Sequence, residues 1–308
     1  MTHGRVVTVL GEVDPDELGF TLSHDHILVD GWGIRQLYEA ILDDEQIALA
    51  ELVRYREAGG RTICDPTNNG LARDPEALAR LSRASGVNIV MGAGWYREMV
   101  YPELIATTST ADLAAMLVRE ITAGVGDTGV RPGFIGEIGT ERGHIPPAVE
   151  RVFRAAGRAH VETGVPILTH TTHWGELALE QLDLLAEEGV PPEVVIVSHL
   201  GDRKGVEHML PIADRGAWIN IDNLAFIEGY APLQFRIDNI VEMCRRGFAE
   251  RMMLSNDICE LGQLATYGGV GYDNVITNVI PRLREQGVSD ADIHQMTVIN
   301  PSKAFAFR

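Results

Sequence analysis

Two histidines stand two positions apart in the segment TLSHDHILVD, residues 21–30, with Asp25 between them and apolar residues after them. Side chains alternate between the two faces of a β-strand, so His24 and His26 would share one face if this segment is extended. A lone histidine at such a place is more often a hydrogen-bonded core or rim residue. Two imidazoles on one face, however, are suited to binding a single metal ion, and Asp25 would then point the other way, towards the helices.

Four further residues with metal-binding side chains end other apolar runs of the chain. They are Glu137 in GFIGEIG, His170 in VPILTH, His199 in EVVIVSH and Asp257 in RMMLSND. Imidazole and carboxylate groups suit Zn²⁺, with Mn²⁺, Co²⁺ or Fe²⁺ as alternatives. Four histidines and two carboxylates exceed what one catalytic zinc needs, and they suffice for two divalent ions if one carboxylate bridges them. We assign the bridge to Glu137, since an unpaired charge within its apolar run would be costly.

Short apolar runs that resemble strands alternate with longer amphipathic segments along the whole chain. The predicted strands are 20–26, 61–67, 87–94, 132–140, 165–171, 193–200, 216–222 and 251–257, and the clearest predicted helices are 44–60, 111–125, 147–164 and 175–189. Eight strand–helix units predict a (β/α)8 TIM barrel forming a single domain over residues 1–308, with a short N-terminal hairpin across its bottom. A doubly wound open sheet shows the same alternation, and periodicity alone does not separate the two folds.

Composition indicates an ordinary globular protein. The 308 residues are 45% hydrophobic and carry a net charge of −18, which disfavours nucleic acid and anionic membranes as partners. The three cysteines are too few and too scattered for a disulfide framework, and they favour a reduced, cytoplasmic location. The N-terminus does not resemble a signal peptide, and no window of 18 uninterrupted apolar residues is present.

The motifs TLSHDH, GFIGEIGT, ILTHTTH, IVSHLGDR and LSND, with the tail from YGGVGYDN to NPSKAFAF, resemble the phosphotriesterase-related family of the amidohydrolase superfamily. The resemblance runs in order over nearly the whole chain. It implies a distorted TIM barrel with a binuclear metal centre and, as is common in the family, a homodimer. His24, His26 and Asp257 would bind the more buried ion, and His170 and His199 the more exposed one. The family's bridging ligand is most often a carboxylated lysine, whereas Glu137 takes that place here, as in the branch called phosphotriesterase homology proteins.

The resemblance further implies hydrolysis of a lactone or carboxylic ester, with organophosphate triesters as a side activity. A hydroxide bridging the two metals would attack the substrate, and Asp257 would accept the proton and pass it to the leaving group. Two alternatives remain at this point. One is a TatD-like metal-dependent nuclease, which the net charge disfavours, and the other is a non-catalytic ligand-binding barrel, which six intact ligand candidates disfavour.

Candidate substrate contacts follow the second, third and fifth strands. Tyr96 and Trp95 end the third strand in GAGWY, although aromatic packing explains them equally well. Arg73 follows the second strand and would bind a substrate carboxylate or phosphate, unless it forms a salt bridge at the start of a helix. His173 lies three residues beyond a ligand candidate and would line the rim.

Specificity is expected in the loops after the seventh and eighth strands, residues 223–236 and 258–274. Their aromatic residues, Phe226, Tyr230, Phe235 and Tyr267, predict a partly apolar pocket. Arg236 is expected to be a solvated loop residue rather than an anion ligand. Asp202 and Arg203, after His199, would either orient that histidine and relay protons or form a surface ion pair. Cys64 and Cys259 are expected to be small packing residues.

Overall fold

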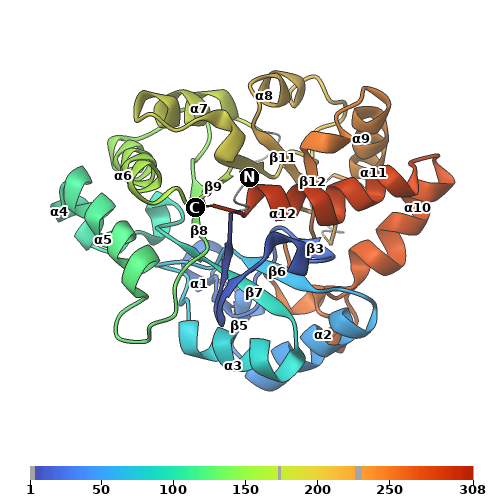
Figure 1. The fold of residues 1–308 in the computed structure, drawn as a ribbon, viewed down its shortest axis with the longest axis horizontal. Coiled ribbons are helices and arrows are strands. Elements are labelled where there is room, and N and C mark those ends of the chain that lie inside the picture. Colours follow the sequence, from blue (N-terminus) through green and yellow to red (C-terminus); the bar gives the residue numbers. More distant parts are fainter. Residues whose placement is uncertain (1–3, 173–174, 226–230, 308) are drawn as a thin grey trace.

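The structure is a computed structural model that describes residues 4–172, 175–225 and 231–307. Eight parallel strands form one nearly closed sheet, with each strand beside its neighbour in the chain (Figure 1). They are β3 Thr21–Leu22, β6 Thr62–Asp65, β7 Asn88–Ala93, β8 Phe134–Gly139, β9 Ile167–His170, β10 Val195–Ser198, β11 Trp218–Ile221 and β12 Met252–Leu254. Every one lies within a predicted strand, and the (β/α)8 barrel is confirmed.

Main-chain hydrogen bonds join the first and last strands just beyond their regular parts. Asp257 N donates to His24 O over 3.1 Å, and His26 N donates to Ile258 O over 3.0 Å. Contacts of this kind bring β3 and β12 together at the end of the barrel where their candidate ligands lie. Residues that are more than 200 positions apart in the chain thereby become neighbours.

Helices surround the strands (Figure 1). They are α1 Trp32–Arg35, α2 Glu45–Glu57, α3 Pro75–Ser85, α4 Leu104–Thr107, α5 Thr110–Ala123, α6 Pro147–Thr163, α7 Ala178–Glu187, α8 Leu210–Asp214, α9 Leu233–Arg245, α10 Ile280–Glu285, α11 Asp290–His294 and α12 Asn300–Ala304. The four clearest predicted helices correspond to α2, α5, α6 and α7. Local sequence sets their ends: Asp44 caps α2 by accepting from Gln46 N and Ile47 N, and Gly164 ends α6 with a φ of 74°.

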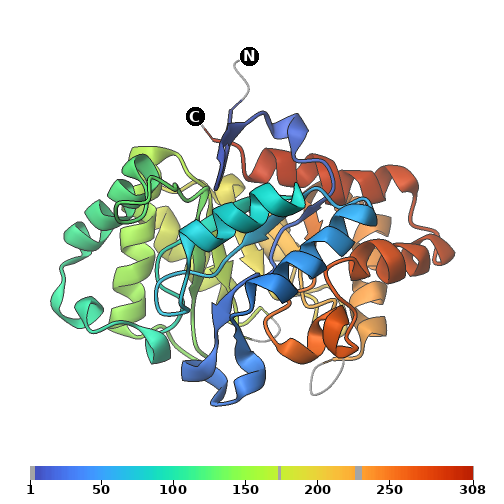
Figure 2. The same ribbon diagram turned by 90° about the horizontal axis from the view of Figure 1, so that it is seen from below.

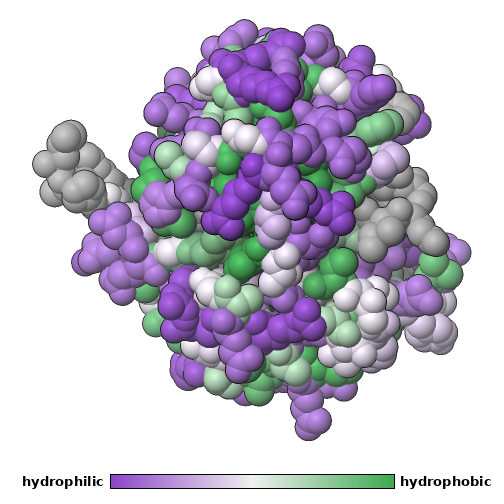
Figure 3. All heavy atoms as spheres, turned by 90° about the vertical axis from the view of Figure 1, so that its right-hand side faces the viewer, coloured by the Kyte–Doolittle hydropathy of each residue, from purple (hydrophilic) through white to green (hydrophobic). Residues whose placement is uncertain are grey.

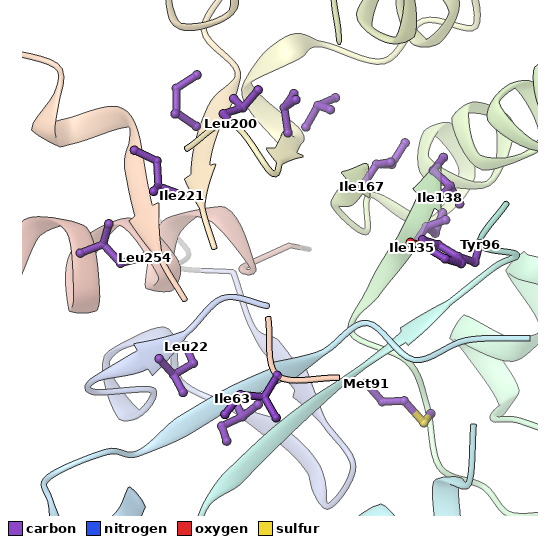
Figure 4. Packing of buried hydrophobic residues seen from close by; sticks show 14 of the residues in the cluster. Leu22, Ile63, Met91, Tyr96, Ile135, Ile138, Ile167, Leu200, Ile221 and Leu254 are labelled. Carbon is purple, nitrogen blue, oxygen red and sulfur yellow. The ribbon is translucent and has the colours of Figure 1, made fainter. Parts of the chain in front are cut away.

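Side chains alternate along the strands between two apolar layers. One layer fills the space between strands and helices and includes Leu22, Ile63, Ile135, Ile221 and Leu254 (Figure 4). The second layer lies inside the barrel and is formed by inward-facing residues, chiefly Cys64, Val90, Phe134, Leu168, Ile196, Trp218 and Met253. The period-2 pattern of the sequence therefore supplies both layers from the same strands.

Both chain ends close the bottom of the barrel. Strands β1 Val6–Thr8 and β2 Gly11–Val13 pair as an antiparallel hairpin, as predicted, and Arg5 pairs with Phe307 across the termini. Val6, Leu18 and Phe305 pack against the interior layer from below. Figure 2 shows this end of the molecule opposite the segment that contains α1.

The segment between β3 and α2 forms structure that the sequence did not predict. Strands β4 Val29–Asp30 and β5 Ile41–Leu42 pair as an antiparallel ribbon, and α1 lies in the turn between them. The ribbon is anchored to the barrel by Asp30 N, which donates to Leu71 O. This segment, residues 29–42, is called the β4–β5 arm below.

Hydrophilic residues cover most of the face that lies on the right-hand side of Figure 1, with smaller hydrophobic areas between them (Figure 3). Such a surface suits a chain with 44 acidic and 26 basic residues. Within the described ranges, no helix combines the length and apolar character needed to cross a bilayer.

Replacing Phe305 with Ala should lower the free energy of unfolding by about 3–5 kcal/mol, because it opens a cavity under the barrel. The Phe305 ring is fully buried and lies edge-on to Phe134, with 5.5 Å between ring centroids. Urea unfolding at fixed metal content measures the change. Tyr267→Ala is the control, since Tyr267 is 52% exposed and should change stability little. Equal losses in the free energy of unfolding in the two variants would contradict the proposed packing of Phe305 at the bottom of the barrel.

Candidate metal centre

A buried carboxylate, Glu137, lies at the centre of four imidazoles at the mouth of the barrel. Its Oε2 atom is 3.0 Å from His170 Nδ1, 3.5 Å from His199 Nε2 and 3.6 Å from His24 Nε2. Its Oε1 atom is 3.3 Å from His26 Nε2. The four histidines come from three strand ends, and all six candidate ligands are at least nine-tenths buried.

Asp257 completes the cluster from the end of β12. Its Oδ1 atom lies 3.3 Å from His24 Nε2 and 3.7 Å from His26 Nε2, while Oδ2 lies 3.8 Å from His199 Nδ1. The six residues chosen from the sequence thus meet in one place. His24 and His26 lie just past the end of β3, and their ring nitrogens nonetheless converge on the same two carboxylates.

The backbone departs from regular strand geometry where it carries these ligands. The β8–β9 register shifts between Ile135 and Ile138, which bracket Glu137. Gly136 is required beside it, because a Cβ there would lie 2.2 Å from Leu168 O. His199 and Asp257 both adopt left-handed conformations, with φ values of 64° and 56°. Non-glycine residues rarely adopt this conformation, and such strain is concentrated at functional sites.

Asp222, which the sequence analysis did not single out, orients two of the histidines. It accepts from His199 N over 2.9 Å, and its oxygens lie 3.0 Å from His199 Nδ1 and 3.2 Å from His24 Nδ1. Thr67 Oγ1 holds His26 Nδ1 at 2.8 Å, and the Tyr96 hydroxyl lies 3.2 Å from His170 Nδ1. Partners of this kind fix ring orientation in metal sites.

A layer of polar side chains separates the ligands from the apolar interior. Ser23 Oγ donates to Asn220 Oδ1, and Asn220 Nδ2 donates to Asp222 Oδ2 and Ser198 Oγ. Ser198 and Asn220 lie two residues beyond Ile196 and Trp218 on their strands, so they face inward one step nearer the mouth. The barrel interior therefore changes along its axis from an apolar layer to a hydrogen-bonded layer and then to the candidate ligands.

Asp25 points away from the imidazoles, as alternation predicts. It accepts from Ser255 Oγ, Asn256 N and Ile258 N, which belong to the loop that carries Asp257. Burial and, to a smaller extent, the charge of Asp25 raise the pKa of Tyr55 on α2, so Asp25 lies near that helix. The middle residue of the HDH motif also fixes the loop of a third candidate ligand.

The electrostatics of the cluster favour bound cations. Burial opposes a charge on His24, but Glu137, Asp222 and Asp257 outweigh it and raise the pKa of His24 to about 10. His170 lies at the pocket side, where burial and the charge of His199 lower its pKa to about 3. The deepest imidazole thus lies in a strongly negative potential, which attracts a metal cation as well as a proton.

The donor set also fits divalent ions by distance. Two groups, His24–Glu137–His199 and His24–His26–Asp257, place ligand atoms within 4.8 Å of one another. Ligand atoms about 2.1 Å from one zinc ion lie roughly 3.4 Å apart, close to the spacings in this cluster. His24 Nε2 is buried and has no hydrogen-bond partner among the described residues, so it is available as a metal ligand.

A pocket of about 340 Å³ opens above the cluster. Its floor contains His26, Glu137, His170, His199 and Asp257. Its walls come from the β4–β5 arm and from the residues that follow β6, β7, β8 and β12; they include Val29, Ile34, Arg35, Leu71, Tyr96, Arg97, Met99, Glu141, Cys259 and Glu260. The unpredicted arm therefore supplies part of the apolar lining, and the segments after β6 and β7 supply the rest.

The model of the phosphotriesterase family matches residues 4–305. The chain belongs to the phosphotriesterase family. It is 36% identical to the phosphotriesterase homology protein of Escherichia coli, over 94% of this chain and 99% of that protein. The crystal structure of that relative, complexed with phosphate in its active site, superposes with a TM-score of 0.91.

Two other relatives have names that state an activity. The chain is 30% identical to an aryldialkylphosphatase of Saccharolobus solfataricus, covering 96% of this chain and 97% of that one. A crystal structure of a lactonase from Listeria monocytogenes matches with a TM-score of 0.93 and 29% identity, covering 99% of each chain. The chain is accordingly a phosphotriesterase-like hydrolase, and its resemblance to this family is confirmed.

The candidate substrate contacts from the sequence separate into two groups. Tyr96 lines the pocket, whereas Trp95 is 1% exposed, packs in the core and lies outside the pocket lining. Arg73 also lies outside the lining, because it donates to Gly92 O and to Glu120 of α5. We retain Tyr96 alone, and assign Trp95 and Arg73 to packing and to a buried ion pair.

Arg236 is fully buried on α9, and the expectation of a solvated loop arginine was wrong. It pairs with Asp202, which also accepts from Asn223 Nδ2 over 2.6 Å. Asn223 Oδ1 lies 2.8 Å from His199 Nδ1. Asp202 therefore supports His199 through Asn223, and it is not a surface residue.

The residues predicted to contribute to specificity, in the loops after β11 and β12, also do not all line the pocket. Phe235 and Tyr267 lie outside the pocket lining, and Cys259 lies within it. His173, Phe226 and Tyr230 fall outside the described residues.

Asp222 and Asn223 could have been found from the sequence by one feature. They directly follow the β11 strand, as His199 follows β10.

Replacing Asp222 with Ala should weaken metal affinity about 10–100-fold, because two candidate ligands lose the carboxylate that orients them. Competition with a chromogenic chelator measures this affinity. Glu51→Ala is the matched control: Glu51 is also a buried carboxylate, but it accepts from Ala265 N and Thr266 N and contacts no ligand. An equal loss in both variants would mean that Asp222 acts only through general stability.

Proposed function

We propose that this hydrolase uses two divalent metal ions to hydrolyse a lactone or carboxylic ester. The ligands would be His24, His26, Glu137, His170, His199 and Asp257. The observation that carries the proposal is the contact of one carboxylate, Glu137, with four imidazoles at 3.0–3.6 Å. Zinc is the ion expected first, with manganese, cobalt or iron as alternatives.

Burial supports a division of the ligands between a deep and a shallow position. His24 is fully buried and is absent from the pocket lining, which includes the other five candidate ligands. The group His24–His26–Asp257 fits a deep position that contains His24, and we assign His170 and His199 to the shallow one. Glu137 touches both sets, which suits a bridging ligand.

Bound divalent ions would supply an activated water and a Lewis acid for the carbonyl oxygen. Asp257 is suited to the proton transfer that hydrolysis requires. Its Oδ1 atom faces His24 and His26, and its carboxylate also lines the pocket. Oδ2 would accept a proton from the attacking water and deliver it to the leaving oxygen.

The pocket supports a small substrate. A space of about 340 Å³ accommodates a lactone ring or a short ester, with Tyr96 beside the reacting group. The lactonase and the aryldialkylphosphatase named above support a carbonyl substrate with phosphotriesters as a side activity, because both reactions polarise an oxygen double-bonded to the attacked atom.

A hydrolysis screen of the metal-reconstituted protein tests the proposal. The panel contains γ- and δ-lactones, aryl esters, phosphotriesters and DNA, each assayed with zinc, manganese or cobalt. We expect turnover of at least one lactone or ester, its loss after chelation and its return when metal is added back. Cleavage of DNA alone would indicate a nuclease, and turnover that survives thorough chelation would overturn the metal mechanism.

Asp257→Asn should lower kcat by about 10²–10⁴-fold while leaving metal content largely intact, since Asn keeps an oxygen donor but accepts no proton. Steady-state kinetics and elemental analysis on one preparation measure both effects. Asp183→Asn, on the exposed surface, is the control and should match the wild type. Unchanged turnover in Asp257→Asn would reject the proton-transfer role.

A further inference from the structure

Two arginines reach the pocket from separate parts of the chain. Arg35 ends α1 in the β4–β5 arm, and Arg97 follows β7 directly after Tyr96. Neither residue was singled out in the sequence. The molecule as a whole carries a net charge of −18, so guanidinium groups beside the active site are a local exception to its overall field.

Arg97 is held rigidly against the candidate metal centre. Its guanidinium carbon lies 4.8 Å from the centroid of the Tyr96 ring, and Tyr96 is bonded to His170. Its aliphatic part fills the space beside Gly139: a Cβ on that glycine would lie 2.9 Å from Arg97 Cγ and 3.0 Å from His170 Cβ. These contacts fix the Arg97 side chain beside Tyr96 and His170.

The N–H donors of the Arg97 guanidinium have few close acceptors among the described residues. Its side chain is 12% exposed, and its nearest acid, Glu141, is 3.5 Å away, longer than the 2.7–2.9 Å of a strong charge-assisted bond. One Nη atom lies 3.5 Å from Met99 Sδ, and Nε has no partner. A guanidinium carries five N–H donors, and leaving them unpaired in a buried place is costly.

Arg35 adds a second positive charge to the same pocket. It pairs with Glu260 at 3.0 Å and is 37% exposed on its side chain. Burial opposes the charge on Arg97, but Tyr96, Glu141 and Glu137 raise the pKa of Arg97, and Arg35 acts against them. The two guanidinium groups therefore lie within each other's field.

Apolar side chains line the same pocket as these arginines and the candidate ligands. Val29, Ile34, Leu71 and Met99 are among the lining residues. A ligand in the pocket thus meets candidate metal ligands on the floor, and apolar side chains and guanidinium groups on the walls. These three kinds of surface match a molecule with a reactive carbonyl, a few carbon atoms and an anionic group.

We propose that Arg97, assisted by Arg35, binds an anionic group on the substrate, which is therefore a lactone or ester that carries a carboxylate, phosphate or sulfonate a few carbons from the reacting carbonyl. This inference rests on the proposed hydrolase function and specifies its substrate class. Arg97 is a specificity-determining residue in this scheme, and the chemistry at the carbonyl belongs to the cluster around Glu137.

A pair of esters of similar length tests the inference: monomethyl glutarate, which carries a carboxylate, and methyl pentanoate, which is neutral. Wild-type enzyme should favour the anionic ester in kcat/KM by at least about 10-fold, the scale of one hydrogen-bonded charge pair. Arg97→Met should remove this preference, mainly through KM, with the neutral ester within about 3-fold of wild type. Arg97→Lys should retain part of the preference, and Arg83→Met, on α3, should retain all of it.

The same comparison with sulfonate and phosphate in place of the carboxylate identifies which anion fits best. Hydrolysis of both esters with no preference, or equal effects of Arg97→Met on both, overturns the inference while the proposed function stands. Loss of all metal-dependent turnover in the screen is the failure of the proposed function itself. Calorimetry with glutarate as an inert probe then decides: binding lost in Arg97→Met supports the anion site, and binding equal in both proteins overturns it.

Discussion

The site depends on one buried carboxylate that is shared by four imidazoles. Glu137 is 2% exposed, and an isolated carboxylate in that position would be strongly disfavoured. Imidazole partners on several sides make its burial tolerable, and the same partners require the strand ends that carry them to converge. The bulge in β8, the left-handed backbone at His199 and Asp257, and the contacts between β3 and β12 all serve this convergence.

Polar groups around the cluster hold the candidate ligands, or the loops that carry them, from other strands. Asp222 of β11's end holds His24 and His199, Thr67 holds His26, and Asp25 holds the loop of Asp257. Asp202 and Arg236 extend this support as far as α9 through Asn223. Fixed orientations of this kind let a site bind a cation without first reorganising.

Much of this arrangement was predictable because barrel strands impose a simple rule. Side chains that end successive parallel strands meet at one mouth, so His170, His199 and Asp257 were found from their positions alone. Hydrogen bonds and ion pairs between distant segments could not be predicted from the sequence. Arg236 was assigned to a loop because the start of α9 at Leu233 was not predicted, and strand alternation gave no sign that the β12 loop donates hydrogen bonds to Asp25. The β4–β5 arm was missed because its strands are only two residues long, below what periodicity can detect.

The β4–β5 arm lies outside the repeating strand–helix framework, yet it provides one wall of the pocket and one of the two arginines. Its ends return to nearly the same place, at β3 and α2, so a change in its length or composition leaves the eight strands and the ligand cluster undisturbed. Diversification of substrate range within such a protein has a natural target here, since new ring sizes or charges can be accommodated by remodelling an appendage rather than the catalytic floor.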